Sequence, residues 1–242
     1  MPRSGKRSPL DGVLPKMILN EVIMRLQSAI FDMDGTLVDS MHVWRDIGPR
    51  LLRSQGIEPE EGIYEKLNLM TLRQSAQYCK DTYGLPQTVD ELMDMINDIM
   101  AGFYQNEVQA KPGVHKFLSL LKMEGVGMYI ATNTDRRLVE IALKRVGIGS
   151  YFRGILTCGE VGVGKSESPE IYERAMRRLQ SNKKDTVIFE DSLHGIKTAK
   201  SAGFRVCAIY DPASQADQEE IKAISDYYIR SFEEMFETKT LG

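Results

Sequence analysis

The segment SAIFDMDGTLVDS, residues 28–40, decides the fold of this chain. A short apolar run ends in Asp32, a tight turn follows at residues 33–36, and a stretch of helical period begins near Val38. Buried parallel strands are apolar on both faces, so this order of signals predicts a strand, a tight loop and a helix. Gly35 allows the tight turn and lets backbone N–H groups face an anion.

The same order of strand and helix signals recurs after Lys111. Short apolar runs alternate there with stretches of helical period. The apolar runs lie at residues 128–132, 154–158, 186–190 and 205–209, and the helical stretches lie at 113–124, 135–146, 169–181 and 193–202. Alternation of this kind is typical of parallel strands joined by helical crossovers, so we predict an α/β fold built on a parallel sheet.

Residues 41–110 interrupt this alternation. They are rich in methionine and acidic residues, their apolar residues follow a helical period, and they contain no convincing strand. Sheet-forming sequence returns after Pro112, which cannot continue a preceding helix. We predict an all-helical insertion at 41–110 within a sheet domain formed by 26–40 and 111–242.

Residues 1–25 differ from the rest of the chain. They carry five basic residues, two acidic residues and three prolines without a sustained period. This composition predicts a disordered tail outside the fold. Met24 is a candidate for the natural first residue, because the first strand follows almost at once.

The composition argues against several classes of function. With 42% apolar and 27% charged residues the chain is ordinary and globular, and its net charge of -3 offers no broad basic surface for nucleic acid. The three cysteines form no C-x-x-C pair, which argues against a disulfide framework and a zinc site and favours a reducing cytoplasm. No apolar run is long enough to span a membrane. We expect a cytoplasmic protein, a monomer or weak dimer, whose partner is a small molecule.

Polar side chains follow the first four apolar runs of the predicted sheet. Open parallel sheets bind ligands beyond the carboxyl ends of their strands, so these side chains are expected to meet at one edge. They are Asp32 and Asp34 after the first run, Thr132 and Asn133 after the second, Lys165 in the loop after the third, and Glu190 with Asp191 at the fourth. Four carboxylates with a single ammonium repel one another, which implies a divalent cation, and oxygen ligands favour magnesium.

A structural role is the alternative explanation for any one of these residues. An Asp that ends a strand is commonly only the N-cap of the next helix. Capping does not readily explain complementary polar groups after four successive strands. The recurrence therefore favours a functional site.

Four segments occur in a fixed order along the chain: FDMDGTLVDS (31–40), ATN (131–133), Lys165 and FEDSLHGI (189–196). Together they resemble the four motifs of the haloacid dehalogenase superfamily, in its β-phosphoglucomutase-like phosphatase branch. The resemblance implies a Rossmann-like, doubly wound parallel sheet with an inserted all-helical cap subdomain. It also implies a magnesium-dependent phosphatase that hydrolyses a small phosphate monoester, such as a sugar phosphate.

The resemblance implies a role for each polar residue at the sheet edge. Asp32 would be the nucleophile that carries an aspartyl-phosphate, and Asp34 would protonate the leaving group and then activate water. Thr132, Asn133 and Lys165 would bind the phosphoryl oxygens. A carboxylate is a weak nucleophile, and alignment with phosphorus is what makes this chemistry reasonable.

The resemblance also implies a set of metal ligands. Magnesium would be bound by the carboxylates of Asp32 and Asp191 and by the main-chain carbonyl of Asp34. Glu190 would bind it directly or through water. The metal and the nearby lysine would neutralise the charge spread over the phosphoryl oxygens.

The segment GEVGVGKS at 159–166 gives a competing reading, because it satisfies the P-loop pattern G-x-x-x-x-G-K-[ST] of nucleotide-binding kinases and hydrolases. A P-loop lysine opens the following helix. Here Ser168 and Pro169 are predicted as N-cap and first helical residue, which leaves Lys165 in a loop. The family that the chain resembles more often has Pro directly after this lysine, whereas Pro169 lies four residues later.

The insertion is expected to determine the substrate, because a helical cap closes over the site and contacts the leaving group. His42, Trp44, Arg45 and Arg73 are candidates by residue type. A phosphosugar mutase of the β-phosphoglucomutase type is the main alternative, but it must bind a second phosphate, and the segment at 68–75 offers only Arg73. Hydrolysis is therefore favoured. A phosphoacceptor receiver domain is disfavoured, since it has no inserted cap and places its lysine last.

Overall fold

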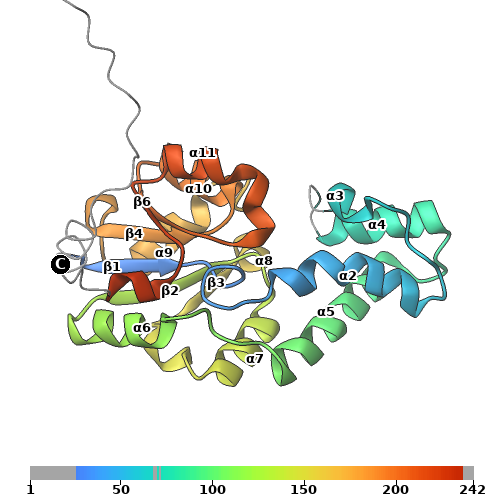
Figure 1. Ribbon diagram of the computed structural model, residues 1–242, viewed down its shortest axis with the longest axis horizontal. Coiled ribbons are helices and arrows are strands. Elements are labelled where there is room, and N and C mark those ends of the chain that lie inside the picture. Colours follow the sequence, from blue (N-terminus) through green and yellow to red (C-terminus); the bar gives the residue numbers. More distant parts are fainter. Residues whose placement is uncertain (1–25, 68–69, 71, 237–242) are drawn as a thin grey trace, which may run out of the picture.

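The computed structural model describes residues 26–67, 70 and 72–236, and its centre is a six-stranded parallel sheet (Figure 1). The strand order is β3-β2-β1-β4-β5-β6, which is a doubly wound, Rossmann-like order with β1 at the centre. The strands are β1 (Ser28–Phe31), β2 (Gly127–Thr132), β3 (Ile155–Thr157), β4 (Thr186–Glu190), β5 (Arg205–Ile209) and β6 (Tyr227–Ile229). The predicted α/β class is confirmed. The tail predicted at 1–25 lies outside the described residues.

Helices cover both faces of the sheet (Figure 1). Residues of β1 alternate between the two faces, so Phe31 belongs to one buried apolar cluster and Ile30 to another. The Phe31 cluster includes side chains of α6 (Val114–Met123) and α7 (Arg136–Val146). The Ile30 cluster includes side chains of α9 (Glu170–Arg178), α10 (Leu193–Ser201) and α11 (Gln218–Ile224).

The described elements between β1 and α6 are all helices: α2 (Met41–Ser54), α3 (Ile63–Leu67), α4 (Leu72–Tyr83) and α5 (Val89–Asn106). Figure 1 shows α2 and α5 running out from the sheet, with α3 and α4 at the far end. These helices share a buried cluster of their own, formed by Leu51, Leu52, Ile63, Ala76, Cys79, Leu85, Leu92 and Ile96. The inserted helical cap thus has a buried cluster of its own, while Val43, Met100 and Phe103 join the Phe31 cluster of the sheet. The exact domain limits at 40/41 and 110/111 stay a prediction.

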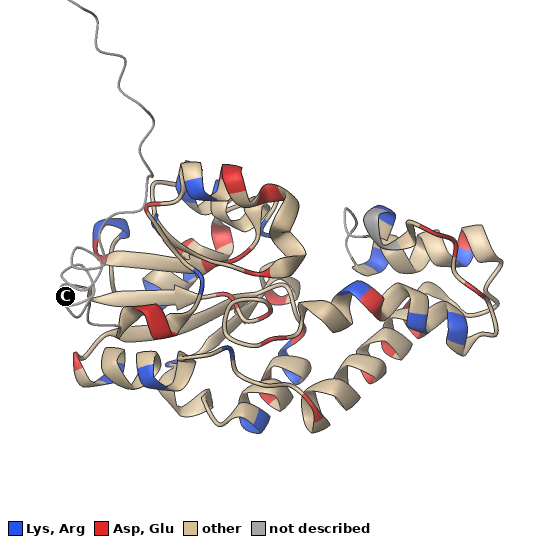
Figure 2. Ribbon diagram, viewed as in Figure 1, with Lys and Arg blue, Asp and Glu red and all other residues tan. Residues whose placement is uncertain are grey.

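Charged residues of both signs are interspersed over the sheet and over α2–α5 (Figure 2). This agrees with the small net charge of -3 in the sequence. Within the described ranges, no helix combines the length and the apolar character needed to cross a membrane.

Local hydrogen bonds shift one predicted boundary, and short elements escape the sequence pattern. The helix predicted near Val38 begins instead at Met41, because Val38 pairs in isolated bridges with Asp34 and Ala110. The prediction therefore starts this helix too early. The sequence analysis also misses β6, α11 and the four-residue helix α8 (Cys158–Val161). The apolar run of β6 and the four-residue helix α8 are too short to carry a period, and α11, with seven residues, makes only about two turns.

Aromatic packing holds the central strands together at the point where β1 ends. The ring of Phe31 stacks on Phe189 of β4 with centroids 4.4 Å apart, and it meets the edges of Phe117 and Phe152. Phe31 is fully buried. Since Phe31 immediately precedes Asp32, this packing also positions the carboxyl end of β1.

The replacement Phe31→Ala is expected to lower the free energy of unfolding by about 3–5 kcal/mol, because it leaves a cavity between two central strands. Urea denaturation measures this change. Met123 is 81% exposed and serves as the control. Met123→Ala should change the free energy of unfolding by no more than about 0.5 kcal/mol. Equal losses in the two variants would contradict this account of the core.

Candidate active site

The carboxyl ends of the central strands bring three acidic residues together. Asp32 follows β1, and its N–H donates to the carbonyl of Phe189 at 2.9 Å. Glu190 ends β4 and Asp191 follows it. Side-chain oxygens of Asp32, Glu190 and Asp191 lie within 4.8 Å of one another, and the three residues are only 6%, 0% and 2% exposed. We call these three residues the carboxylate cluster.

Lys165 lies against two members of the carboxylate cluster. Its Nζ is 2.6 Å from Oδ1 of Asp32 and 3.1 Å from Oε1 of Glu190, and it also donates to the carbonyl of Ala131 at 3.4 Å. Lys165 is itself 4% exposed. One buried ammonium therefore links the end of β1 to the end of β4.

The buried charges shift the pKa values of this cluster. Burial raises the pKa of Asp32 to about 8, although the charge of Lys165 acts to lower it. Burial raises the pKa of Asp191 well above its usual range, and the charges of Glu190 and Asp32 add to this effect. Burial acts to lower the pKa of Lys165, but the charges of Asp32 and Glu190 outweigh it, so its pKa lies well above the usual value.

This donor set fits a hard divalent cation. Three buried carboxylates face one ammonium, so the cluster carries excess negative charge when all three acids are ionised. Burial is the main cause of the raised pKa values of Asp32 and Asp191, and the neighbouring carboxylates add to it. All ligand atoms are oxygens, which suits magnesium better than a soft metal.

Glu190 is held on both of its oxygens. Oε1 accepts from Lys165 and from the hydroxyls of Tyr172 at 3.3 Å and Ser192 at 3.0 Å, while Oε2 accepts from the N–H of Asp191 at 3.2 Å. Ser192 is also the N-cap of α10. The same side chain thus starts a helix and orients a buried carboxylate.

A glycine makes room for Glu190 beneath α10. A Cβ added to Gly195 would lie 1.8 Å from Oε1 and 2.6 Å from Cδ of Glu190. The contacts that hold Glu190 leave its carboxylate little freedom to move away. Position 195 therefore has to lack a side chain.

Asp34 has surroundings different from those of Asp32. Its Oδ1 accepts from the hydroxyls of Ser40 at 2.6 Å and Tyr104 at 2.5 Å, and its Oδ2 accepts from the hydroxyl of Thr134 at 2.6 Å. Three neutral donors therefore hold this carboxylate, where an ammonium holds Asp32. Burial raises the pKa of Tyr104 well above its usual value, so the phenol stays protonated.

The turn after Asp34 supports Asp191 and is fixed from two sides. Gly35 has φ of 75°, and a Cβ there would lie 2.3 Å from Oδ2 of Asp191. The hydroxyl of Thr36 donates to Oδ1 of Asp191 at 3.0 Å. Lys111 donates to the carbonyl of Gly35 at 2.6 Å and to Asp211 at 2.9 Å. The turn is thereby tied to the loop after β5.

The two other predicted site residues lie after β2 and differ in burial. Thr132 is buried, and its hydroxyl oxygen accepts from the N–H of Thr134 at 3.2 Å. Asn133 is exposed. Thr132 directly follows Ala131, whose carbonyl accepts from Lys165. The roles of Thr132 and Asn133 in binding phosphate stay predictions.

Lys165 lies in a loop and not at the start of a helix. Helix α9 begins at Glu170 with Pro169 as its N-cap, one residue later than predicted. The hydroxyl of Ser168 accepts from the N–H of Glu170 at 3.2 Å. A P-loop lysine opens the next helix, so this geometry disagrees with the P-loop alternative.

Sequence reasoning missed the residues that surround the predicted carboxylates. Thr36 and Ser40 lie within the deciding segment, but nothing in their spacing distinguishes a hydroxyl that bonds a carboxylate from one in a turn. Tyr104 is 70 residues from Asp34 in the sequence, so no local signal could reveal the contact. The other missed residues are Thr134, Tyr172, Ser192 and Lys111.

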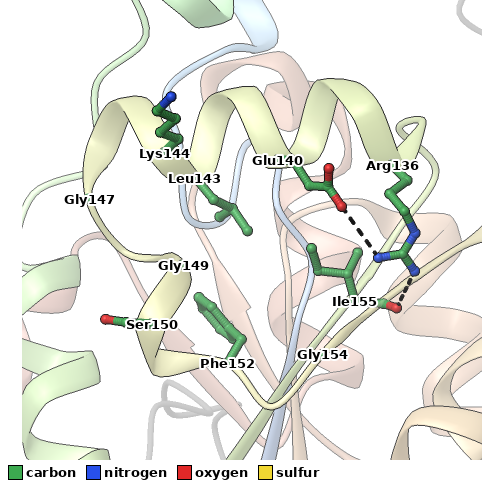
Figure 3. Close-up of a pocket in the computed structure, with 10 residues that line it drawn as sticks. All are labelled: Arg136, Glu140, Leu143, Lys144, Gly147, Gly149, Ser150, Phe152, Gly154 and Ile155. Carbon is green, nitrogen blue, oxygen red and sulfur yellow. Dashed lines mark hydrogen bonds and ion pairs between the residues drawn. The ribbon is translucent and has the colours of Figure 1, made fainter.

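A cavity of about 500 Å³ lies apart from the carboxylate cluster, between α7 and the segment that leads into β3 (Figure 3). Arg136 crosses its rim, donates to the carbonyl of Ile155 at 2.8 Å and pairs with Glu140 at 3.8 Å. None of the predicted site residues lines it. This cavity is therefore distinct from the candidate active site.

Comparison with known proteins gives a family. The family described as haloacid dehalogenase-like hydrolase matches residues 29–209. The phosphorylated carbohydrates phosphatase of Thermotoga maritima is 26% identical over 178 residues, which are 74% of this chain and 82% of that protein. The validoxylamine A 7'-phosphate phosphatase of Streptomyces hygroscopicus subsp. limoneus is 28% identical over 176 residues, with 72% of this chain and 81% of that protein covered.

Solved structures give the same fold. The crystal structure of CbbY from Rhodobacter sphaeroides in complex with phosphate superimposes with a TM-score of 0.74 at 22% identity. The match covers 86% of this chain and 95% of that one. The family match spans most of the chain, from β1 to β5, and the fold agrees with it. The chain belongs to the haloacid dehalogenase-like hydrolases.

Proposed function

We propose that this chain is a magnesium-dependent phosphatase that hydrolyses a small phosphate monoester, a sugar phosphate or similar, through an aspartyl-phosphate on Asp32. The observation that carries the proposal is the pairing of two unlike acids on one short segment. Asp32 lies with Lys165 in the carboxylate cluster, whereas Asp34 is held by hydroxyls. A nucleophile and a proton donor need such different surroundings.

The relatives support the substrate class. The Thermotoga protein is named for phosphorylated carbohydrates, and the Streptomyces protein for a phosphate ester of validoxylamine A. Both names denote phosphatases that act on phosphorylated small molecules. By this similarity the chain is a phosphoric monoester hydrolase, and its partner is a small phosphorylated metabolite.

The chemistry follows from the residues in two steps. In the first step a carboxylate oxygen of Asp32 attacks phosphorus, the bond from phosphorus to the leaving oxygen breaks, and Asp34 gives that oxygen a proton. In the second step water attacks phosphorus, Asp34 takes its proton, and the bond between phosphorus and Asp32 breaks. Phosphate leaves and both acids return to their starting states. Lys165 and Thr132 bind the phosphoryl oxygens.

Magnesium would be held by Asp32, Asp191 and Glu190, together with the main-chain carbonyl of Asp34. When bound, it neutralises charge on the phosphoryl oxygens. Lys165 supplies further positive charge at the site. The buried position of all three carboxylates excludes water from their electrostatic interactions, which strengthens them.

A phosphosugar mutase is the alternative within the same chemistry. It requires a cation for a second phosphate, and Arg73 was the candidate in the insertion. Arg73 pairs with Asp90 at 2.5 Å on the surface of the insertion, so its charge is already engaged. Hydrolysis is therefore the better proposal.

A phosphate-release screen over sugar phosphates and nucleotides tests the function. We expect activity that needs Mg²⁺, with sugar phosphates above nucleotides. Asp32→Asn should lower kcat by at least about 10³-fold, because an amide is a far poorer nucleophile. Phosphate release is measured with and without a chelator.

Lys144→Ala is the control for loss of activity through misfolding, since Lys144 lies on α7 beside the cavity of Figure 3. This control should retain wild-type activity. Equal activity in wild type and Asp32→Asn would show that the nucleophile is wrongly assigned. Isomerisation of a sugar phosphate without net release of phosphate would favour the mutase.

Magnesium is expected to stabilise the fold more at pH 8 than at pH 6. The folded chain without metal keeps a proton on Asp32 up to a pKa of about 8, whereas the unfolded chain loses it near the ordinary pKa of 3.8. The metal-free stability therefore falls as the pH rises between these two values. Magnesium competes with that proton for Asp32, so the stabilisation that magnesium gives to the fold grows as the proton is lost.

The measurement is the Mg²⁺-induced rise in Tm at the two pH values. Asp191→Asn removes a proposed ligand and should reduce the rise at pH 8. The same rise in Tm at pH 6 and pH 8 in the wild type would argue against competition between a proton and magnesium for Asp32.

Gly195→Ala is expected to lower kcat/KM by about tenfold or more, because the new methyl group displaces the Glu190 carboxylate. Overpacking should also lower the free energy of unfolding by about 1–3 kcal/mol. Gly102→Ala is the matched control, since Gly102 lies in helix α5 with no atom within 4 Å of an added Cβ. Steady-state kinetics and urea denaturation measure both variants. Wild-type kinetics in Gly195→Ala would refute the proposed role of Glu190 as a magnesium ligand.

A further inference from the structure

Tyr104 brings a hydroxyl from the insertion to the proposed proton donor. It lies on α5, is fully buried, and places its hydroxyl 2.5 Å from Oδ1 of Asp34. The two residues are 70 positions apart in the sequence. A buried hydroxyl at this distance from a carboxylate is an orienting contact, because carboxylates bind O–H donors strongly.

Trp44 fixes the direction of the hydrogen bond from Tyr104. Its indole Nε1 lies 3.0 Å from the Tyr104 oxygen. An indole N–H can only donate, so it occupies an acceptor position on the phenolic oxygen. The phenolic hydrogen is left for Asp34. Trp44 on α2 and Tyr104 on α5 thus act as one directed pair.

The two oxygens of Asp34 differ in how many donors they accept. Ser40 and Tyr104 both donate to Oδ1, at 2.6 Å and 2.5 Å. Among the described residues, Thr134 alone donates to Oδ2, at 2.6 Å. A carboxylate offers about four lone-pair sites over its two oxygens. Both lone-pair sites of Oδ1 accept a hydrogen bond, whereas one lone-pair site of Oδ2 accepts none from the part of the chain that the structure describes.

We propose that Tyr104, with its direction set by Trp44, is a positioning residue that holds Oδ1 of Asp34 so that Oδ2 transfers the proton. The proton passes from Oδ2 to the leaving oxygen as its bond to phosphorus breaks, and returns to Oδ2 from water in the second step. This inference rests on the proposed role of Asp34 as proton donor. It adds an oxygen assignment and two residues from the insertion.

Leaving-group dependence separates positioning from mere packing. The p-nitrophenolate ion leaves without a proton, whereas the alcohol of benzyl phosphate has to be protonated as it leaves. The quantity kcat/KM reports steps up to the first irreversible one, here the transfer to Asp32. A misplaced Asp34 therefore lowers kcat/KM for hydrolysis of benzyl phosphate more than for hydrolysis of p-nitrophenyl phosphate.

The experiment compares wild type, Tyr104→Phe and Trp44→Phe with these two substrates at saturating Mg²⁺. For Tyr104→Phe we expect kcat/KM to fall about tenfold or more with benzyl phosphate and less than about threefold with p-nitrophenyl phosphate. Trp44→Phe keeps the Tyr104 hydroxyl and should change the ratio in the same direction by a smaller factor. Phe in place of Tyr104 retains the buried ring, and Tm values show whether each variant is folded.

Two reference variants make the result decisive. Tyr151→Phe removes a hydroxyl that bonds Ser119 at 2.7 Å outside the site, and it should leave the ratio unchanged. Asp34→Asn should change the ratio more than any other variant.

A changed ratio in Asp34→Asn with an unchanged ratio in Tyr104→Phe and Trp44→Phe overturns the inference alone. An unchanged ratio in Asp34→Asn overturns the proton-donor role in the proposed function. If Tyr104→Phe does not fold, an unchanged ratio in Trp44→Phe is sufficient to overturn the inference.

Discussion

The contact on which the site depends is the buried ammonium of Lys165 between Asp32 and Glu190. It joins the ends of two adjacent central strands at 2.6 Å and 3.1 Å. Breaking a buried ion pair on one side leaves an uncompensated charge, which is costly. The cluster is nevertheless under-compensated, because Asp191 adds a third carboxylate. The fold therefore holds an arrangement whose charges favour binding a cation, and the neighbouring residues can be understood as supports for it.

Those supports come from elements that also build the fold. Ser192 caps α10 and bonds Glu190. Gly195, in the first turn of the same helix, gives that carboxylate its space. Lys111, where the chain returns from the insertion, ties the Gly35 turn to Asp211. Since each support also serves the packing of the sheet and its helices, the geometry of the cluster is coupled to the stability of the whole domain.

The sequence predicts the strand ends better than their surroundings. Periodicity locates five of the six strands, because buried parallel strands are continuous apolar runs. The carboxylates at their ends then follow from topology. β6 was missed because its apolar run, between Asp226 and Arg230, is only three residues long, and α8 was missed because four residues carry no helical period. Contacts such as Tyr104 to Asp34 depend on how the insertion packs against the sheet, which no local pattern encodes. The helix start near Val38 was wrong because bridges to Asp34 and Ala110 override the helical pattern.

The different surroundings of Asp32 and Asp34 arise from one local turn. Two residues apart in a strand, both side chains would point to the same face. β1 ends at Phe31, however, and the carbonyl of Met33 accepts from the N–H groups of both Leu37 and Val38, at 2.8 Å and 3.0 Å. This turn breaks the strand period between the two acids. Asp32 stays with the buried ammonium, while Asp34 meets the hydroxyls of Ser40, of Tyr104 in the insertion and of Thr134 in the β2 loop. Two identical side chains thereby acquire the unlike surroundings that nucleophilic attack and proton transfer require.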